Sequence, residues 1–131
     1  MENKFRIANR LIGGNEPPVI IAELGINHNG KLDKAISIAE SAIRCGAEII
    51  KHQTHIVEDE MIDAAKKIKP GNSNKSIYEI ISNCALSEKD EEKLMQHIKN
   101  LKAIFISTPF SRAAANRLKK FNIPAYKIGS G

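Results

Sequence analysis

The stretch VIIAELGINHNGKLDKAISIAESAIRCGAEIIKHQT, residues 19–54, reads as a strand, a helix and a second strand. Its first segment, 19–25, is nearly all apolar, which is typical of a parallel strand covered on both faces. Apolar residues then recur at helical spacing over 32–43, and Gly46 supplies a helix-ending residue. The second strand is predicted over 48–54. This order of elements favours a parallel sheet.

The same alternation continues along the chain. A third strand is predicted over 103–108 and a fourth over 125–131, with helices from Ser87 onward and from Ser111 to about residue 121. Such repeats indicate either a doubly wound open sheet or half of an eight-stranded barrel, which needs about 250 residues when complete. The chain has 131 residues and stops on a predicted strand. We therefore predict an α/β fold, the N-terminal half of a TIM (β/α)8-type barrel with about four βα units, and expect a truncated chain.

Two segments depart from this repeat. Residues 5–12 are predicted to form a short hairpin or cap, which divides the chain into 1–18 and a half-barrel over 19–131. Residues 55–86 form a long excursion after the second strand, with a turn at Pro70-Gly71-Asn72 and a short helix near its end. Long insertions after a strand are more often functional than accidental.

Composition excludes several classes of protein. Hydrophobic residues make up 42 % and charged residues 27 %, and the formal net charge is +5. With only four Phe, two Tyr and no Trp, a stacking surface for nucleic acid is not predicted. No apolar run approaches the roughly 20 residues that span a bilayer, and the first residues do not resemble a signal peptide. We expect a cytoplasmic protein without nucleic-acid or membrane partners, and expect Cys45 and Cys84 to be buried and reduced.

Each predicted strand carries polar residues at or near its C-terminal end, where ligands bind in parallel α/β folds. These residues are Glu23, Lys51, Gln53, Ser107, Thr108, Lys127 and Ser130. Alternation puts Lys51 and Gln53 on one face of their strand. Two lysines inside a barrel would repel each other unless a polyanion, such as a phosphate with a carboxylate, lay between them. Glu23 could pair with a lysine structurally or act as a general acid or base, and both roles stay open.

The histidines receive different predictions. His52 and His55 straddle a strand end, which is a weak metal-binding pattern, and we expect His52 to pack between strand and helix. His97 lies on a helix without an evident partner. His28, in the turn after the first strand, is the candidate functional histidine. No dinucleotide or Walker A motif is present, so neither an NAD nor an ATP site is predicted.

Four motifs in order resemble successive strand-end motifs of sialic acid synthases. They are IAELGINHNG (21–30), IKHQT (50–54), FISTPF (105–110) and YKIGSG (126–131). The stretch from Pro70 to Tyr78 also resembles the insertion of the bacterial N-acetylneuraminate synthase branch.

This resemblance implies that phosphoenolpyruvate condenses with N-acetylmannosamine to give N-acetylneuraminate and phosphate. It implies phosphoenolpyruvate contacts at Lys51, Gln53, Thr108, Lys127 and Ser130. It also implies a catalytic role for Glu23 and a sugar contact for Asn72. Since Lys127 and Ser130 would alternate to opposite faces, we expect Ser130 to lie in a turn past the strand.

The resemblance further implies a divalent metal, usually Mn²⁺, whose histidine ligands lie in the second half of the barrel and not in this chain. An antifreeze-like C-terminal domain that completes the site of a homodimer is also absent, so we expect the chain alone to be inactive. Legionaminic and pseudaminic acid synthases share the motifs, although the Asn72 region favours N-acetylmannosamine. A related synthase acting on a sugar phosphate, and a non-catalytic half-barrel that binds or oligomerises, remain alternatives.

Overall fold

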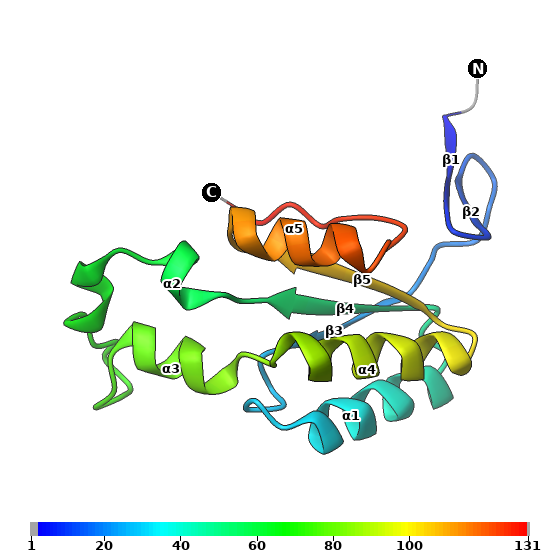
Figure 1. Cartoon of the computed structure of the whole chain (residues 1–131). Helices are drawn as coiled ribbons and strands as arrows, with labels where there is room; N and C mark the ends of the chain where they lie inside the picture. The colour runs from blue at the N-terminus through cyan, green and yellow to red at the C-terminus, as the bar shows by residue number, and fades with distance from the viewer. Residues whose placement is uncertain (1–2, 131) are drawn as a thin grey trace.

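The computed structural model describes residues 3–130, which form a three-stranded parallel sheet and a separate two-stranded sheet (Figure 1). The parallel sheet has the order β3 (Ile21–Gly25), β4 (Ile49–Thr54) and β5 (Ile104–Pro109). Three helices accompany it: α1 (Leu32–Arg44), α4 (Glu88–Asn100) and α5 (Arg112–Lys120). The α/β class and the parallel pairing are therefore confirmed. The sheet is open, and no barrel closes within the described residues.

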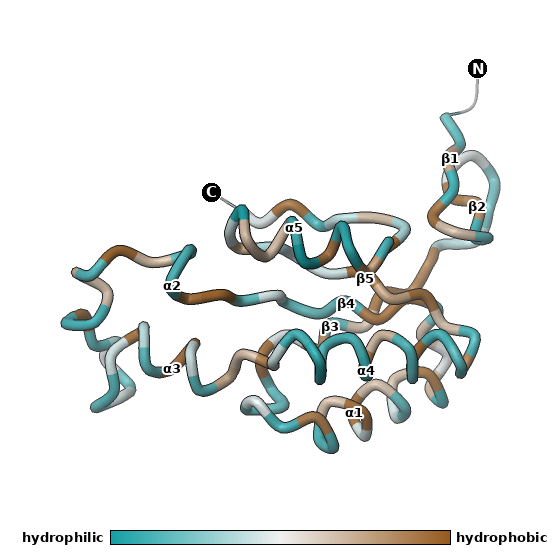
Figure 2. The backbone as a smooth tube through the Cα atoms, in the orientation of Figure 1, coloured by the Kyte–Doolittle hydropathy of each residue, from teal (hydrophilic) through white to brown (hydrophobic). Residues whose placement is uncertain are grey.

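The three helices share one apolar core with one face of the sheet. Its members include Leu24, Ile50 and Phe105 from the strands, and Ala39, Leu94 and Leu118 from the helices. The N-terminal serines predicted for the later helices are confirmed. Ser87 and Ser111 accept hydrogen bonds from Asp90 N and Ala114 N, each at 3.1 Å. Figure 2 shows α4 mainly hydrophilic along its visible side, as expected for a helix that buries a single stripe.

The predicted fourth strand is wrong as a regular strand. Residues 125–130 form only one parallel bridge, between Tyr126 and Ser107, together with a hydrogen bond from Lys127 N to Ser107 O at 3.0 Å. Gly131 lies outside the described residues. The pairing does not continue as a strand beyond this bridge. Ile128, two residues after Tyr126, is 79 % exposed and has no packing to hold it in place.

The predicted N-terminal hairpin is confirmed as β1 (Lys4–Ile7) paired antiparallel with β2 (Arg10–Gly13). It lies beyond the N-terminal ends of the parallel strands (Figure 1). Arg10 fastens it there, because Arg10 Nε is 2.7 Å from Glu48 Oε2 and Arg10 Nη2 donates to Pro17 O at 2.8 Å.

The long excursion after β4 contains three short helices: α2 (Val57–Glu60), η1 (Asp63–Lys66) and α3 (Ile77–Cys84). It extends beyond the C-terminal ends of the strands, at the left of Figure 1. A capping box starts α3, since Ser76 Oγ accepts from Glu79 N while the Glu79 carboxylate accepts from Ser76 N. No helix of the described chain is long and apolar enough to cross a membrane.

Candidate functional site

Strand-end polar residues of β3, β4 and β5 gather on the sheet face opposite the helices. Glu23 lies opposite Lys51 in the pairing of β3 with β4, and Gln53 lies opposite Thr108 in the pairing of β4 with β5. Lys51 Nζ is 3.1 Å from Glu23 Oε2. The Lys51 side chain is 13 % exposed and that of Glu23 is 54 % exposed. The ammonium group is thus held within the face, while the carboxylate reaches solvent.

Lys127 joins this face through the bridge beside β5. Because Tyr126 lies opposite Ser107, the next residue, Lys127, lies beside Thr108. Neighbouring residues in register project to the same side of a sheet. The face therefore combines two lysines, on β4 and on the final segment, with the Glu23 carboxylate. We call this set, Glu23, Lys51, Gln53, Thr108 and Lys127, the strand-end face.

Two further predicted site residues lie at the margin. Ser130 is exposed and follows the bridge, in the irregular segment where it was expected. A side-chain carbon added at Gly129 would come within 3.7 Å of Thr108 Cγ2, so this segment folds back over the strand-end face. Asn72 is exposed in a turn of the excursion before α3, and its sugar contact stays a prediction.

Gln53 is held by an imidazole ring. His55 Nε2 lies 3.3 Å from Gln53 Oε1, and His55 Nδ1 lies 2.9 and 3.1 Å from the two Glu60 oxygens. The ring also stacks on Phe110, with centroids 4.4 Å apart. Sequence reasoning considered His55 only as a weak metal partner. The acidic segment Glu58-Asp59-Glu60 is visible in the sequence, but its contact with His55 was not predicted.

On the helix-covered face, His52 packs between strand and helix as predicted. His52 Nδ1 lies 3.0 Å from Glu91 Oε1 of α4, and His52 Nε2 lies 3.3 Å from His28 Nε2. His28 is only 1 % exposed. Burial, and then the neighbouring His52, lower the pKa of His28 to about 4.

His28, the candidate functional histidine, therefore lies in the buried layer and not on the strand-end face, and a functional role for it stays a prediction. The turn folds the ring inward, where Gly30 N donates to His28 Nδ1 at 3.2 Å. Ser107, expected at the rim with Thr108, also faces the helices, because its hydroxyl lies 2.7 Å from the Thr54 hydroxyl. Strand alternation explains this outcome, since Ser107 pairs with His52 and Thr108 with Gln53.

Glu91 is the centre of this buried network and was not foreseen. Arg117 Nη1 donates to Glu91 Oε2 at 3.1 Å, and the Thr54 hydroxyl donates to Oε1. Burial opposes ionisation of Glu91, but hydrogen bonds from His52, Thr54 and Arg117 outweigh it and keep its pKa below the usual value. In the sequence, Glu91 lies in the charged run EKDEEK at 88–93, which by itself reads as a solvated helix face.

The described residues do not form a metal site. Within residues 3–130, no group of three or more His, Cys, Asp and Glu side chains could hold an ion. His52 and His55 instead contact Glu91 and Glu60 respectively. The metal that the sequence resemblance implies does not fit these residues, and no catalytic step of this chain is derived through it.

Three smaller expectations need correction. His97, predicted without a partner, lies 2.9 Å from Glu40 Oε1 of α1. Cys45, predicted buried, is exposed because it follows the last turn of α1, and Cys84 is partly buried. Both cysteines are free thiols.

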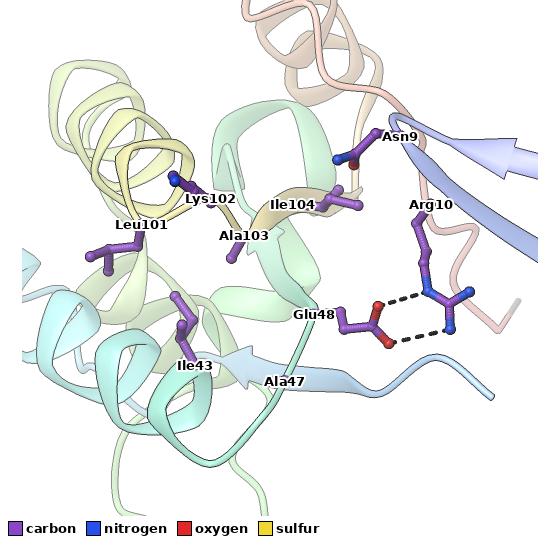
Figure 3. A pocket seen from close by; sticks show the side chains of 9 residues that line it. All are labelled: Asn9, Arg10, Ile43, Ala47, Glu48, Leu101, Lys102, Ala103 and Ile104. Atoms are coloured by element: carbon purple, nitrogen blue, oxygen red, sulfur yellow. Dashed lines mark hydrogen bonds and ion pairs between the residues drawn. The ribbon is translucent and has the colours of Figure 1, made fainter. Parts of the chain in front are cut away.

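A hollow of about 290 Å³ lies at the other end of the sheet (Figure 3). It opens between the hairpin and the N-terminal ends of β4 and β5. Its lining residues are Asn9, Arg10, Ile43, Ala47, Glu48, Leu101, Lys102, Ala103 and Ile104. The charged pair Arg10 and Glu48 is already joined by hydrogen bonds. Ligands of parallel α/β sheets bind at the C-terminal strand ends, so we interpret this hollow as a packing gap beneath the hairpin.

Comparison with known proteins matches residues 20–131 to the NeuB family. N,N'-diacetyllegionaminic acid synthase of Campylobacter jejuni is 32 % identical over 117 residues, covering 86 % of this chain and 35 % of the relative. Human N-acetylneuraminate-9-phosphate synthase is 30 % identical over 126 residues, which cover 93 % of this chain and 35 % of the relative. The crystal structure of N-acetylneuraminic acid (sialic acid) synthetase from Leptospira borgpetersenii, in complex with citrate, matches the fold of this chain with a TM-score of 0.81 at 28 % identity. The match covers 98 % of this chain and 41 % of the synthetase. The chain thus spans little more than a third of these relatives.

Proposed function

The chain belongs to the NeuB family, and we propose that its strand-end face is the phosphoenolpyruvate-binding part of a sialic acid synthase-type active site. One observation carries the proposal: Lys51 and Lys127 flank Gln53 and Thr108 on one sheet face, with Glu23 ion-paired to Lys51. Ammonium groups are strong point-charge partners for phosphate and carboxylate, the two anionic groups of this substrate. A polyanion between the lysines relieves their mutual repulsion.

The proposed chemistry is a condensation of phosphoenolpyruvate with an amino-sugar aldehyde. C3 of phosphoenolpyruvate forms a bond to the aldehyde carbon, water adds at C2, and the bond from C2 to the phosphate oxygen breaks to release phosphate. Lys51, Gln53, Thr108, Lys127 and Ser130 bind the phosphoenolpyruvate. Glu23, whose carboxylate reaches solvent beside Lys51, transfers protons at the reacting carbons.

We propose N-acetylmannosamine as the acceptor sugar, with Asn72 as a contact to it. The relatives leave a second candidate open, since one of them is a legionaminic acid synthase at 32 % identity. A comparison of acceptor aldehydes in a phosphate-release assay separates these substrates. Because the human relative is named N-acetylneuraminate-9-phosphate synthase, the same assay also tests sugar phosphates as acceptors.

We further propose that the described fold is the first part of a (β/α)8 barrel. The chain covers 41 % of the Leptospira synthetase at a TM-score of 0.81, which supports this assignment. The remaining strand ends, and the family's Mn²⁺ site and dimer contacts, would come from sequence outside the 131 residues. On this proposal the chain alone binds phosphoenolpyruvate but releases no phosphate from it.

Calorimetric titration of the chain with phosphoenolpyruvate tests the anion contacts. We expect Lys51→Ala and Lys127→Ala each to weaken binding by about 1 to 3 kcal/mol, the range for a hydrogen bond to a charged group. Lys119→Ala removes the same charge from the exposed side of α5 and should leave affinity unchanged. Equal affinities for all four chains would remove the proposed role of the two lysines.

A further inference from the structure

The surroundings of His55 fix the protons on its ring. Its Nδ1 lies 2.9 and 3.1 Å from the two oxygens of Glu60, and a carboxylate only accepts hydrogen bonds, so Nδ1 carries a proton. Its Nε2 lies 3.3 Å from the carbonyl oxygen of Gln53, which also only accepts. With the Gln53 amide in this orientation, both ring nitrogens donate, one to Glu60 and one to Gln53. The side chains of His55 and Glu60 are 4 % and 11 % exposed.

This arrangement determines what Gln53 offers to a ligand. With its Oε1 bound by His55, the amide nitrogen is directed elsewhere and its two hydrogens remain for the strand-end face. If His55 Nε2 lost its proton, that nitrogen would become an acceptor, and the amide would turn to donate to it. Gln53 would then present its carbonyl oxygen to the ligand. An amide nitrogen attracts an anion, whereas a carbonyl oxygen repels it.

We propose that His55 and Glu60 are positioning residues that hold the Gln53 amide with its nitrogen toward the anionic substrate. The inference rests on the proposed function, because it takes Gln53 as a contact of phosphoenolpyruvate. The groups in contact with the ring are Glu60 of α2, Gln53 of β4 and Phe110 after β5, and among these only Glu60 is charged. Nearby Asp59 instead accepts a hydrogen bond from Ala113 N at 2.7 Å.

Glu60→Gln is the decisive variant because a positioning role and a purely structural role of Glu60 predict opposite changes in phosphoenolpyruvate affinity. A glutamine oxygen can still accept from Nδ1, but the neutral side chain no longer stabilises the imidazolium, so Nε2 becomes an acceptor and the Gln53 amide turns. We expect phosphoenolpyruvate to bind about tenfold more weakly, the loss of roughly one charge-assisted hydrogen bond. A purely structural Glu60 predicts the reverse, since removing a negative charge favours an anion. Glu58→Gln, the same change at an exposed position of α2, should bind as tightly as the native chain or more tightly.

Nitrogen-15 NMR of the ligand-free native chain provides the second measurement. We expect both ring nitrogens of His55 to carry a proton in the native chain, and Nε2 to have lost its proton in Glu60→Gln. A neutral His55 ring, or unchanged or tighter binding by Glu60→Gln, overturns the positioning role. If the native chain binds no phosphoenolpyruvate, the proposed function fails. In that case two NMR observations still decide whether His55 orients the amide. They are the protonation of the His55 ring in the native chain and the change of the Gln53 side-chain amide signals in Glu60→Gln.

Discussion

At the scale of single residues, strand position decides which surface a side chain serves. Lys51 and His52 are adjacent in the chain but belong to different environments. Lys51 lies 3.1 Å from Glu23 on the open face, whereas His52 is 1 % exposed and lies 3.0 Å from Glu91 in the helix-covered layer. Substitutions at Lys51 should therefore act mainly on ligand binding, and substitutions at His52 mainly on stability.

The buried histidine of the β3–α1 turn makes stability depend on pH. The pKa of His28 is about 4 in the folded chain, against an ordinary value of 6.5. Between these values the unfolded chain binds a proton that the folded chain does not, so acid favours unfolding. We expect the free energy of unfolding to fall by about 3 kcal/mol between pH 7 and pH 4 through this residue. Urea unfolding at several pH values measures it.

One variant isolates the contribution of His28. His28→Gln should flatten the dependence of stability on pH across this interval, although the chain becomes less stable at pH 7. A slope that survives in His28→Gln would assign the acid sensitivity to another group.

Part of the site could be predicted at this scale, and part could not. Alternation within an apolar strand puts Lys51 and Gln53 on one face, and the same rule extends to Glu23 and Thr108 once the strands are parallel. The burial of His28 and Glu91 depends on contacts between distant segments. No local pattern carries that information, because a turn histidine and a helical glutamate are usually exposed.

At the scale of elements, the capping box of α3 fixes the end of the excursion that carries Asn72. Ser76 Oγ accepts from Glu79 N at 3.2 Å, and Ser76 is 1 % exposed. We expect Ser76→Ala to destabilise the chain by about 1 kcal/mol and to speed amide exchange in α3. Ser82→Ala, at an exposed position of the same helix, is the control. Equal exchange rates in both variants would mean that the cap does not hold α3.

Element prediction succeeded where propensity and packing agree. The helices α1, α4 and α5 were predictable because an apolar stripe and a terminal signal coincide, as at Ser87 and Ser111. The segment 125–130 failed because its apolar, β-prone composition needs a second neighbouring strand to become regular. In the described chain it meets β5 at a single bridge.

At the scale of the whole molecule, the sheet has one face covered by helices and one face that carries the polar strand ends. The covered face holds the core and the Glu91 network, and the other holds two lysines, one glutamate and the amide set by His55. The hairpin occupies the opposite end of the strands (Figure 1). This division separates the stabilising residues from those proposed to bind substrate.

The most direct test of the proposed phosphoenolpyruvate site is to map its binding on the chain by amide and side-chain NMR shifts. The proposed function predicts saturable shifts at Lys51, Gln53, Thr108 and Lys127, with none beneath the hairpin at Asn9 and Lys102. Saturable shifts confined to the hollow beneath the hairpin, or no shifts at millimolar phosphoenolpyruvate, would contradict it.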